Sequence, residues 1–188
     1  MFWKKKKTES TLEKVISELA DYLLDNGLND DFRRLAFDKY RELALSNFSE
    51  LQIILQNPPK ASINYSSEKH GLGGWLSACQ FSIFEIIYNS GKDALPFIRK
   101  IAWGEYDWIQ GNAIELLIRL ASQGIKRDEI VLEIKQNFPE IRYEAQLYTI
   151  QPLLPRLESD EKLRSIFDEL MSIEEFKESY DELTKCNA

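Results

Sequence analysis

Residues 106–138 read YDWIQGNAIELLIRLASQGIKRDEIVLEIKQNF and carry the most regular pattern in the chain. Apolar residues recur three and four positions apart on both sides of Gly124, as they do in amphipathic helices. Glycine adopts the left-handed backbone conformation that commonly ends a helix, so Gly124 is expected to cap the first helix. The stretch therefore predicts a helix pair over residues 106–123 and 127–138.

A related pattern occurs on either side of this stretch. A shift of 33 residues aligns it with residues 75–102, and shifts of 34 and 36 residues align it with residues 141–171. The first shift pairs Gly91 with Gly124. Small residues occupy one repeated position and are expected to let neighbouring helices approach: Ala78, Gly111 and Ala145. Helix pairs that recur every 33 to 36 residues are typical of α-solenoids.

The alignments also predict a register. They pair the following large residues: Trp75 with Trp108, Phe97 with Ile130, and Ile114 with Tyr148. They predict an almost fully buried face formed by Ile83, Phe84, Ile87, Leu116, Leu117, Leu120, Ile130 and Ile134. The second helices of the pairs, residues 93–102, 127–138 and 160–171, are expected to be neighbours in chain order and to line a concave side.

The unit length, the glycine-closed turn, Pro96 and the segments YDWIQGNAIELLIRLASQGI and RDEIVLEI resemble HEAT-like repeats of bacterial type. The resemblance covers residues 75–171, about half of the chain, and implies an all-α solenoid of about three helix pairs. The Asp and Arg typical of the turn inside a HEAT repeat are only partly matched, by Asp93, Asp128 and, in the third copy, Asp160. The particular family therefore stays unassigned.

The rest of the chain is expected to complete one domain over residues 1–188. An N-terminal helical cap is predicted over residues 10–57, with helices at 11–25, 30–45 and 48–56 and with Ser10 or Thr11 as the first cap. Two prolines end this cap, and a loop over residues 58–74 follows. Residues 172–188 are expected to form a C-terminal helix or tail.

The composition excludes several classes of protein. A net charge of -7 and a pI near 4.9 argue against binding to a nucleic-acid backbone, which requires a basic surface. No apolar stretch approaches the roughly 20 residues that span a bilayer, and no secretory signal is recognised, so the cytoplasm is expected. The segment Phe2-Trp3 with Lys4 to Lys7 could contact an anionic membrane surface, but a solvated terminus is the simpler interpretation.

Candidate catalytic groups are few. His70 is the single histidine, and the two cysteines, Cys79 and Cys186, lie far apart, so neither a Ser-His-Asp triad nor a tetrahedral zinc site is indicated. Glu105 and Asp107 could act as paired carboxylates, but acidic residues before a helix are usually capping groups. We expect no catalytic residue, no cofactor and no metal.

The segment between the first two repeats is the strongest candidate for a binding site. It reads Trp103-Gly104-Glu105-Tyr106-Asp107-Trp108, and aromatic residues beside charges are typical of binding hot spots. Core packing and partner contact both remain open, with Trp108 expected to lie partly in the core and Trp103 and Tyr106 at the surface. The same strip is expected to continue at the next repeat junction through Glu140, Arg142, Tyr143 and Glu144.

These observations favour a non-catalytic module that binds a protein, and a basic partner would suit its acidity. The most specific form is an immunity-type inhibitor of a bacterial toxin, because bacterial HEAT-like proteins of this size have that profile. Two alternatives stay open: a HEAT-like DNA glycosylase-type enzyme with Trp103, Tyr106, Asp107 and Trp108 near its site, and an adaptor subunit of a larger assembly.

Overall fold

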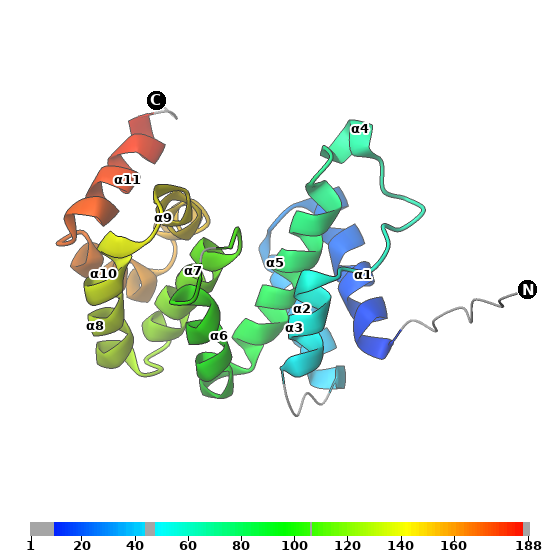
Figure 1. Ribbon diagram of the computed structural model, residues 1–188, viewed down its shortest axis with the longest axis horizontal. Coiled ribbons are helices and arrows are strands. Elements are labelled where there is room, and N and C mark those ends of the chain that lie inside the picture. The colour runs from blue at the N-terminus through cyan, green and yellow to red at the C-terminus, as the bar shows by residue number, and fades with distance from the viewer. Residues whose placement is uncertain (1–9, 44–47, 106, 186–188) are drawn as a thin grey trace, which may run out of the picture. The chain divides into compact units, whose positions relative to one another are not determined.

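A computed structural model (Figure 1) describes residues 10–43, 48–105 and 107–185, and all regular structure within them is helical. The all-α class is therefore confirmed. The chain divides into two compact units, residues 1–89 and 90–188. The boundary falls between the two helices that the repeat alignment assigned to the first pair, and the single-domain organisation stays a prediction.

The first unit is built around its last helix. Its helices are α1 (Thr11–Asn26), α2 (Asp30–Leu43), α3 (Ser49–Gln56), α4 (Ser67–His70) and α5 (Gly74–Asn89). Helix α5 packs against α1, α2 and α3 (Figure 1). The predicted cap of α1 is confirmed, because the Ser10 hydroxyl accepts a hydrogen bond from the Glu13 N–H at 3.1 Å and the Glu13 carboxylate accepts one from the Ser10 N–H at 2.8 Å.

The segment before α5 is more ordered than the predicted loop. It contains the one-turn helix α4, and the indole of Trp75 donates a hydrogen bond of 2.8 Å to the carbonyl of Pro59 at the start of the segment. The ring of Tyr65 stacks on His70 with centroids 6.0 Å apart. The segment is thus fixed at its base by aromatic packing and by one buried hydrogen bond.

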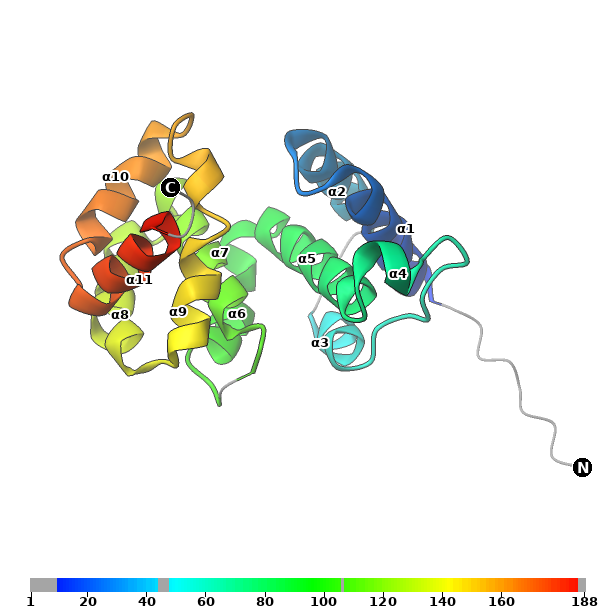
Figure 2. The same ribbon diagram turned by 90° about the horizontal axis from the view of Figure 1, so that it is seen from above.

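The second unit surrounds one long helix. Its elements are η1 (Gly91–Ala94), α6 (Leu95–Ala102), α7 (Gln110–Ser122), α8 (Arg127–Asn137), η2 (Phe138–Glu140), α9 (Tyr143–Ile150), η3 (Leu154–Arg156), α10 (Glu161–Leu170) and α11 (Glu174–Lys185), where η denotes a 3-10 helix. Helix α7 packs against α6, α8, α9 and α10, while α11 lies beside α9 (Figure 2). The predicted C-terminal helix or tail is therefore a helix, α11.

Several predicted helix ends shift by a few residues. Helix α7 begins at Gln110 instead of Tyr106, which lies outside the described residues. Helix α9 ends at Ile150 and not at Leu157, because Pro152 follows two residues later and a proline cannot donate the backbone hydrogen bond that would continue the helix.

The predicted register between repeats needs correction in the second helices. The buried positions in and next to α6 match those in and next to α8 at an offset of 36 residues: Ala94, Leu95, Ile98 and Ala102 correspond to Ile130, Val131, Ile134 and Phe138. The 33-residue shift had paired Phe97 with Ile130, but Phe97 is only partly buried. A slip of three residues is nearly one helical turn, so apolar residues still match apolar residues and the error is invisible in the periodicity.

The first helices of the pairs show the same offset. The Nε2 of Gln110 donates to the Ala102 carbonyl at 3.1 Å, and the Nε2 of Gln146 donates to the Phe138 carbonyl at 3.3 Å, so the two glutamines occupy equivalent positions 36 residues apart. The 34-residue alignment, which paired Ile114 with Tyr148, was therefore wrong. Ile114 is fully buried, whereas the Tyr148 side chain is 39% exposed.

Other packing predictions are confirmed. All eight residues of the predicted buried face are buried, none with more than 3% exposure. Gly91 and Gly124 have positive φ angles of 59° and 80°, as expected for left-handed caps. A methyl group added to Gly111 would lie 2.4 Å from the Ala145 carbonyl oxygen, so the small residue does permit a close approach of α7 and α9.

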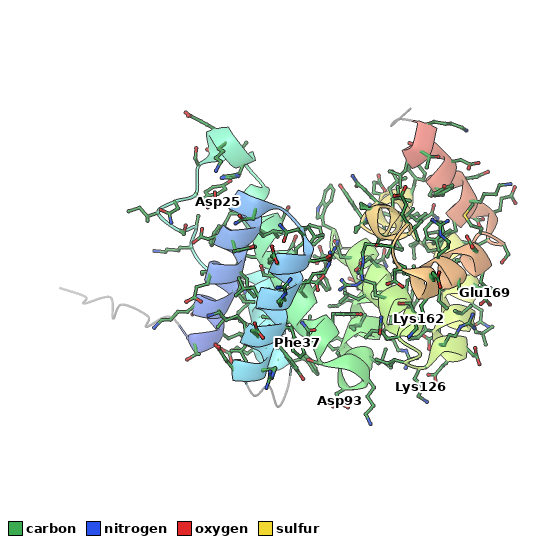
Figure 3. All side chains as sticks on the ribbon, turned by 180° about the vertical axis from the view of Figure 1, so that it is seen from behind. Asp25, Phe37, Asp93, Lys126, Lys162 and Glu169 are labelled. Atoms are coloured by element: carbon green, nitrogen blue, oxygen red, sulfur yellow. The ribbon has the colours of Figure 1, made fainter. Side chains whose placement is uncertain are left out.

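Ion pairs connect the second helices in chain order. The guanidinium of Arg99 on α6 lies 2.7 Å from the carboxylate of Glu133 on α8. The ammonium of Lys135 on α8 lies 2.9 Å from the carboxylate of Glu169 on α10, which is labelled in Figure 3. Each pair joins residues 34 positions apart, so one kind of contact recurs between successive helices.

Candidate partner-binding surface

Trp103 is the C-cap residue of α6, and its side chain contacts Glu133 on α8. Its side chain is partly buried, and its indole Nε1 donates a long hydrogen bond of 3.4 Å to the Glu133 carboxylate. Arg99 also pairs with that carboxylate. Trp103 is thus held against α8 by a group that is itself fixed, and only part of its ring reaches solvent.

Trp108 lies at the surface, which corrects the expectation that it lies partly in the core. Its side chain is 65% exposed, and its ring centroid lies 6.4 Å from that of Tyr148 on α9. The expectation came from pairing it with Trp75, which is only 6% exposed. Because α7 begins at Gln110, Trp108 precedes the helix and does not share the helical environment of Trp75.

The second junction leads onto the C-terminal helix. Arg142 is the exposed N-cap residue of α9, and Glu144 lies in the first turn of that helix. Tyr143 is 44% exposed and donates a hydrogen bond from its hydroxyl to the Glu182 carboxylate on α11. The surface expected at this junction therefore extends to α11.

The two junctions together line a pocket of about 360 Å³. Its walls come from the junction between α6 and α7 and from the junction between α8 and α9: Trp103, Gly104, Gln110, Asn137, Glu140, Ile141 and Arg142. The structure thus brings Trp103, Glu140 and Arg142 together. The lining does not include Glu105, Asp107, Trp108, Tyr143 or Glu144, and Tyr106 lies outside the described residues.

The net negative charge of the chain is concentrated in its C-terminal segment, which contains α9, α10 and α11. Residues 140–188 contain twelve acidic and six basic residues, whereas residues 1–139 contain nineteen acidic and eighteen basic ones. Helix α11 alone carries five acidic residues in twelve. Sequence reasoning left α11 out of the candidate surface, although a count of charge along the chain would have indicated it.

Two acidic side chains on the second helices, Glu129 and Glu169, form ion pairs with basic side chains within the protein. Hydrogen bonds from Lys135 and Arg127 hold the pKa of Glu169 below its ordinary value, and Lys126 with Arg99 has the same effect on the pKa of Glu129. In contrast, three exposed acidic residues, Glu140, Glu144 and Glu178, form no ion pair with another described residue. These three carboxylates therefore face solvent, where they can attract a positively charged molecule.

Other kinds of site receive no support from the described part of the chain. No group of three or more His, Cys, Asp or Glu side chains there could hold a metal ion. None of the described helices combines the length and the apolarity needed to span a membrane. Comparison with protein families, with curated proteins and with solved structures found no match to this chain.

Proposed function

We propose that this chain is a non-catalytic module that binds a basic protein through one face of the second unit. We call this surface the acidic aromatic face, and it comprises Trp108, Glu140, Tyr143, Glu144, Tyr148, Glu178 and Glu182. The observation that supports it is the excess of negative charge in residues 140–188, which adjoins three exposed aromatic side chains.

The two kinds of side chain would have different roles in binding. Exposed aromatic rings such as Trp108 and Tyr148 supply contact area at little cost in conformational entropy and are enriched among binding hot spots. Unpaired carboxylates attract a positively charged partner over a distance of about 10 Å and raise its rate of encounter. A basic protein would both pack against the aromatic rings and be attracted by the carboxylates.

We also propose that the helices form a HEAT-like α-solenoid of about three helix pairs behind an N-terminal helical cap. The support comes from the 36-residue offset between Gln110 and Gln146 and from the ion pairs that join successive second helices. In a solenoid, equivalent junctions lie side by side, which would place residues 103–108 beside residues 140–144.

The most specific form of the proposal is an immunity-type inhibitor in a bacterial cytoplasm that binds a basic toxin. A DNA glycosylase-type enzyme on a HEAT-like scaffold would need a basic groove, and the charge of residues 140–188 opposes one. An adaptor subunit would use the same face with a different partner. The identity of the captured protein separates an inhibitor from an adaptor.

The test is affinity capture from the host cell with charge-reversed variants. The test variant changes three exposed acids of the acidic aromatic face to lysine: Glu144, Glu178 and Glu182. The matched control changes three exposed acids at or on α10 and has the same net charge: Glu158, Glu161 and Asp168. Both must melt like the wild type before capture is compared.

We expect the control to retain the partner and the test variant to lose it. The captured partner should be basic and should bind the purified wild-type protein directly. Equal capture by all three proteins would contradict the proposal. The interface would then be sought in the segment before α5, where Ile63 and Leu72 are 99% and 96% exposed.

A further inference from the structure

The pocket between the two junctions offers hydrogen-bond acceptors beside one cationic side chain, Arg142. The Nδ2 of Asn137 donates to the Glu133 carbonyl at 2.7 Å, and the Nε2 of Gln110 donates to the Ala102 carbonyl at 3.1 Å. The indole N–H of Trp103 is directed to the Glu133 carboxylate. The indole N–H, both amide donors of Gln110 and one amide donor of Asn137 are thus engaged within the protein, which leaves the side-chain oxygens of Asn137 and Gln110 for a ligand.

A carboxylate and an aromatic ring complete the lining. Glu140 is exposed and forms no ion pair with another described residue, and Trp103 is one of the lining residues. A planar cation that donates several hydrogen bonds matches acceptors, a carboxylate and an aromatic ring at once. Among protein side chains, the guanidinium of arginine has this combination of properties.

We propose that this pocket receives an arginine side chain of the basic partner, with its guanidinium stacked on Trp103 and paired with Glu140. The proposal rests on the proposed function and adds the specific residue that the partner presents. Hot spots at interfaces are commonly single arginine or aromatic side chains seated in a pocket, while the surrounding charges mainly speed association.

Competing occupants fit the lining less well. A carboxylate or phosphate would need donors, and the one cationic side chain in the lining is Arg142, which lies exposed at the N-cap of α9. An aliphatic side chain would cover the oxygens of Asn137 and Gln110 without donating a hydrogen bond to either, which is unfavourable. A lysine would pair with Glu140 but would lack the planar face that stacks on Trp103.

The experiment uses the full-length protein and a small probe, N-acetyl-arginine amide. The four tryptophans give four indole N–H signals in a ¹H–¹⁵N NMR spectrum, and Trp103→Phe and Trp75→Phe variants assign two of them. We expect the Trp103 signal to shift in a saturable way at millimolar probe while the Trp75 signal stays constant, because a single side chain gives only weak affinity. The neutral isostere, N-acetyl-citrulline amide, should shift it about tenfold less at equal concentration.

Three variants sharpen the test. Glu140→Gln should weaken the arginine probe about tenfold, and Glu158→Gln, which changes an exposed acid that does not line the pocket, should leave its affinity unchanged. Arg142→Gln should strengthen binding because it removes a like charge. Equal shifts with citrulline, no saturable shift with arginine, or tighter binding of N-acetyl-glutamate amide than of the arginine probe would each overturn the proposal.

The outcomes also separate this proposal from the proposed function. If the charge-reversed variant loses the partner while Glu140→Gln binds the arginine probe like the wild type, the face is the interface and the pocket proposal fails. If the pocket binds arginine while the charge-reversed variant still captures the same partner, the pocket proposal stands and the acidic aromatic face is rejected.

Discussion

Gly111 lies where α7 meets α9, and replacing it tests the packing on which both junctions depend. A methyl group at this position would lie 2.4 Å from the Ala145 carbonyl oxygen and 2.7 Å from the Cβ of Tyr148. Ordinary van der Waals contact begins at about 3.4 Å, so Gly111→Ala would displace α9 by about 1 Å. The displacement also stretches the 3.2 Å hydrogen bond that the Thr149 hydroxyl donates to the Gly111 carbonyl.

The expected change in stability is the balance of three effects. Overpacking against backbone atoms costs up to about 3 kcal/mol, and the weakened hydrogen bond costs about 1 kcal/mol. The higher helix propensity of alanine stabilises α7 by about 1 kcal/mol and so offsets part of this cost. The last two effects cancel, so we expect Gly111→Ala to lower the free energy of unfolding by about 1 to 3 kcal/mol.

Urea unfolding followed by circular dichroism measures this change. The matched control is Gly73→Ala, because a methyl group at Gly73 meets no atom within 4 Å and its φ angle lies outside the left-handed region. The control should stay within about 0.5 kcal/mol of the wild type. A Gly111→Ala protein as stable as the wild type would refute the close approach of α7 and α9.

Three further predictions concern buried and charged groups. Gln146→Leu should cost about 1 to 3 kcal/mol of unfolding free energy in urea titrations, because it leaves the Ser179 hydroxyl and the Phe138 carbonyl without their buried partner. Glu169→Gln should lower the urea midpoint more at pH 7 than at pH 3, because the pKa of Glu169 is lowered by folding and its stabilisation falls as the carboxylate is protonated. In a Cys186→Ser background, Cys79 should not react with a thiol reagent at pH 8 until the protein unfolds, because burial raises its pKa to about 12.

The sequence allowed the helices to be predicted well but their register poorly. Apolar periodicity and the turn residues Gly91 and Gly124 located most helices of both units but not α4, which lies in the predicted loop, and the predicted buried residues are buried. The register depends on polar contacts instead. Gln110 and Gln146 define equivalent positions through bonds to main-chain carbonyls, and such bonds leave no trace in an apolar pattern.

The candidate surface was predicted only in part for a similar reason. Trp103, Glu140 and Arg142 do converge on one pocket. Trp108 is exposed because α7 begins only at Gln110, after it. The ends of a helix are predicted less precisely from apolar periodicity than its centre. A charge count along the sequence would have marked α11 as acidic, but its place beside α9 arises from tertiary packing, which a single sequence does not reveal.

Association kinetics give the sharpest test of the acidic aromatic face. The captured partner would be bound to the wild type, to the charge-reversed variant of Glu144, Glu178 and Glu182, and to the α10 control at increasing salt. We predict that the association rate constant of the wild type and of the control falls steeply as salt rises, while the dissociation rate constant changes little. The charge-reversed variant should associate slowly at every salt concentration. A wild-type association rate that is independent of salt, or one that the reversal leaves unchanged, would contradict recognition of a basic partner by this face.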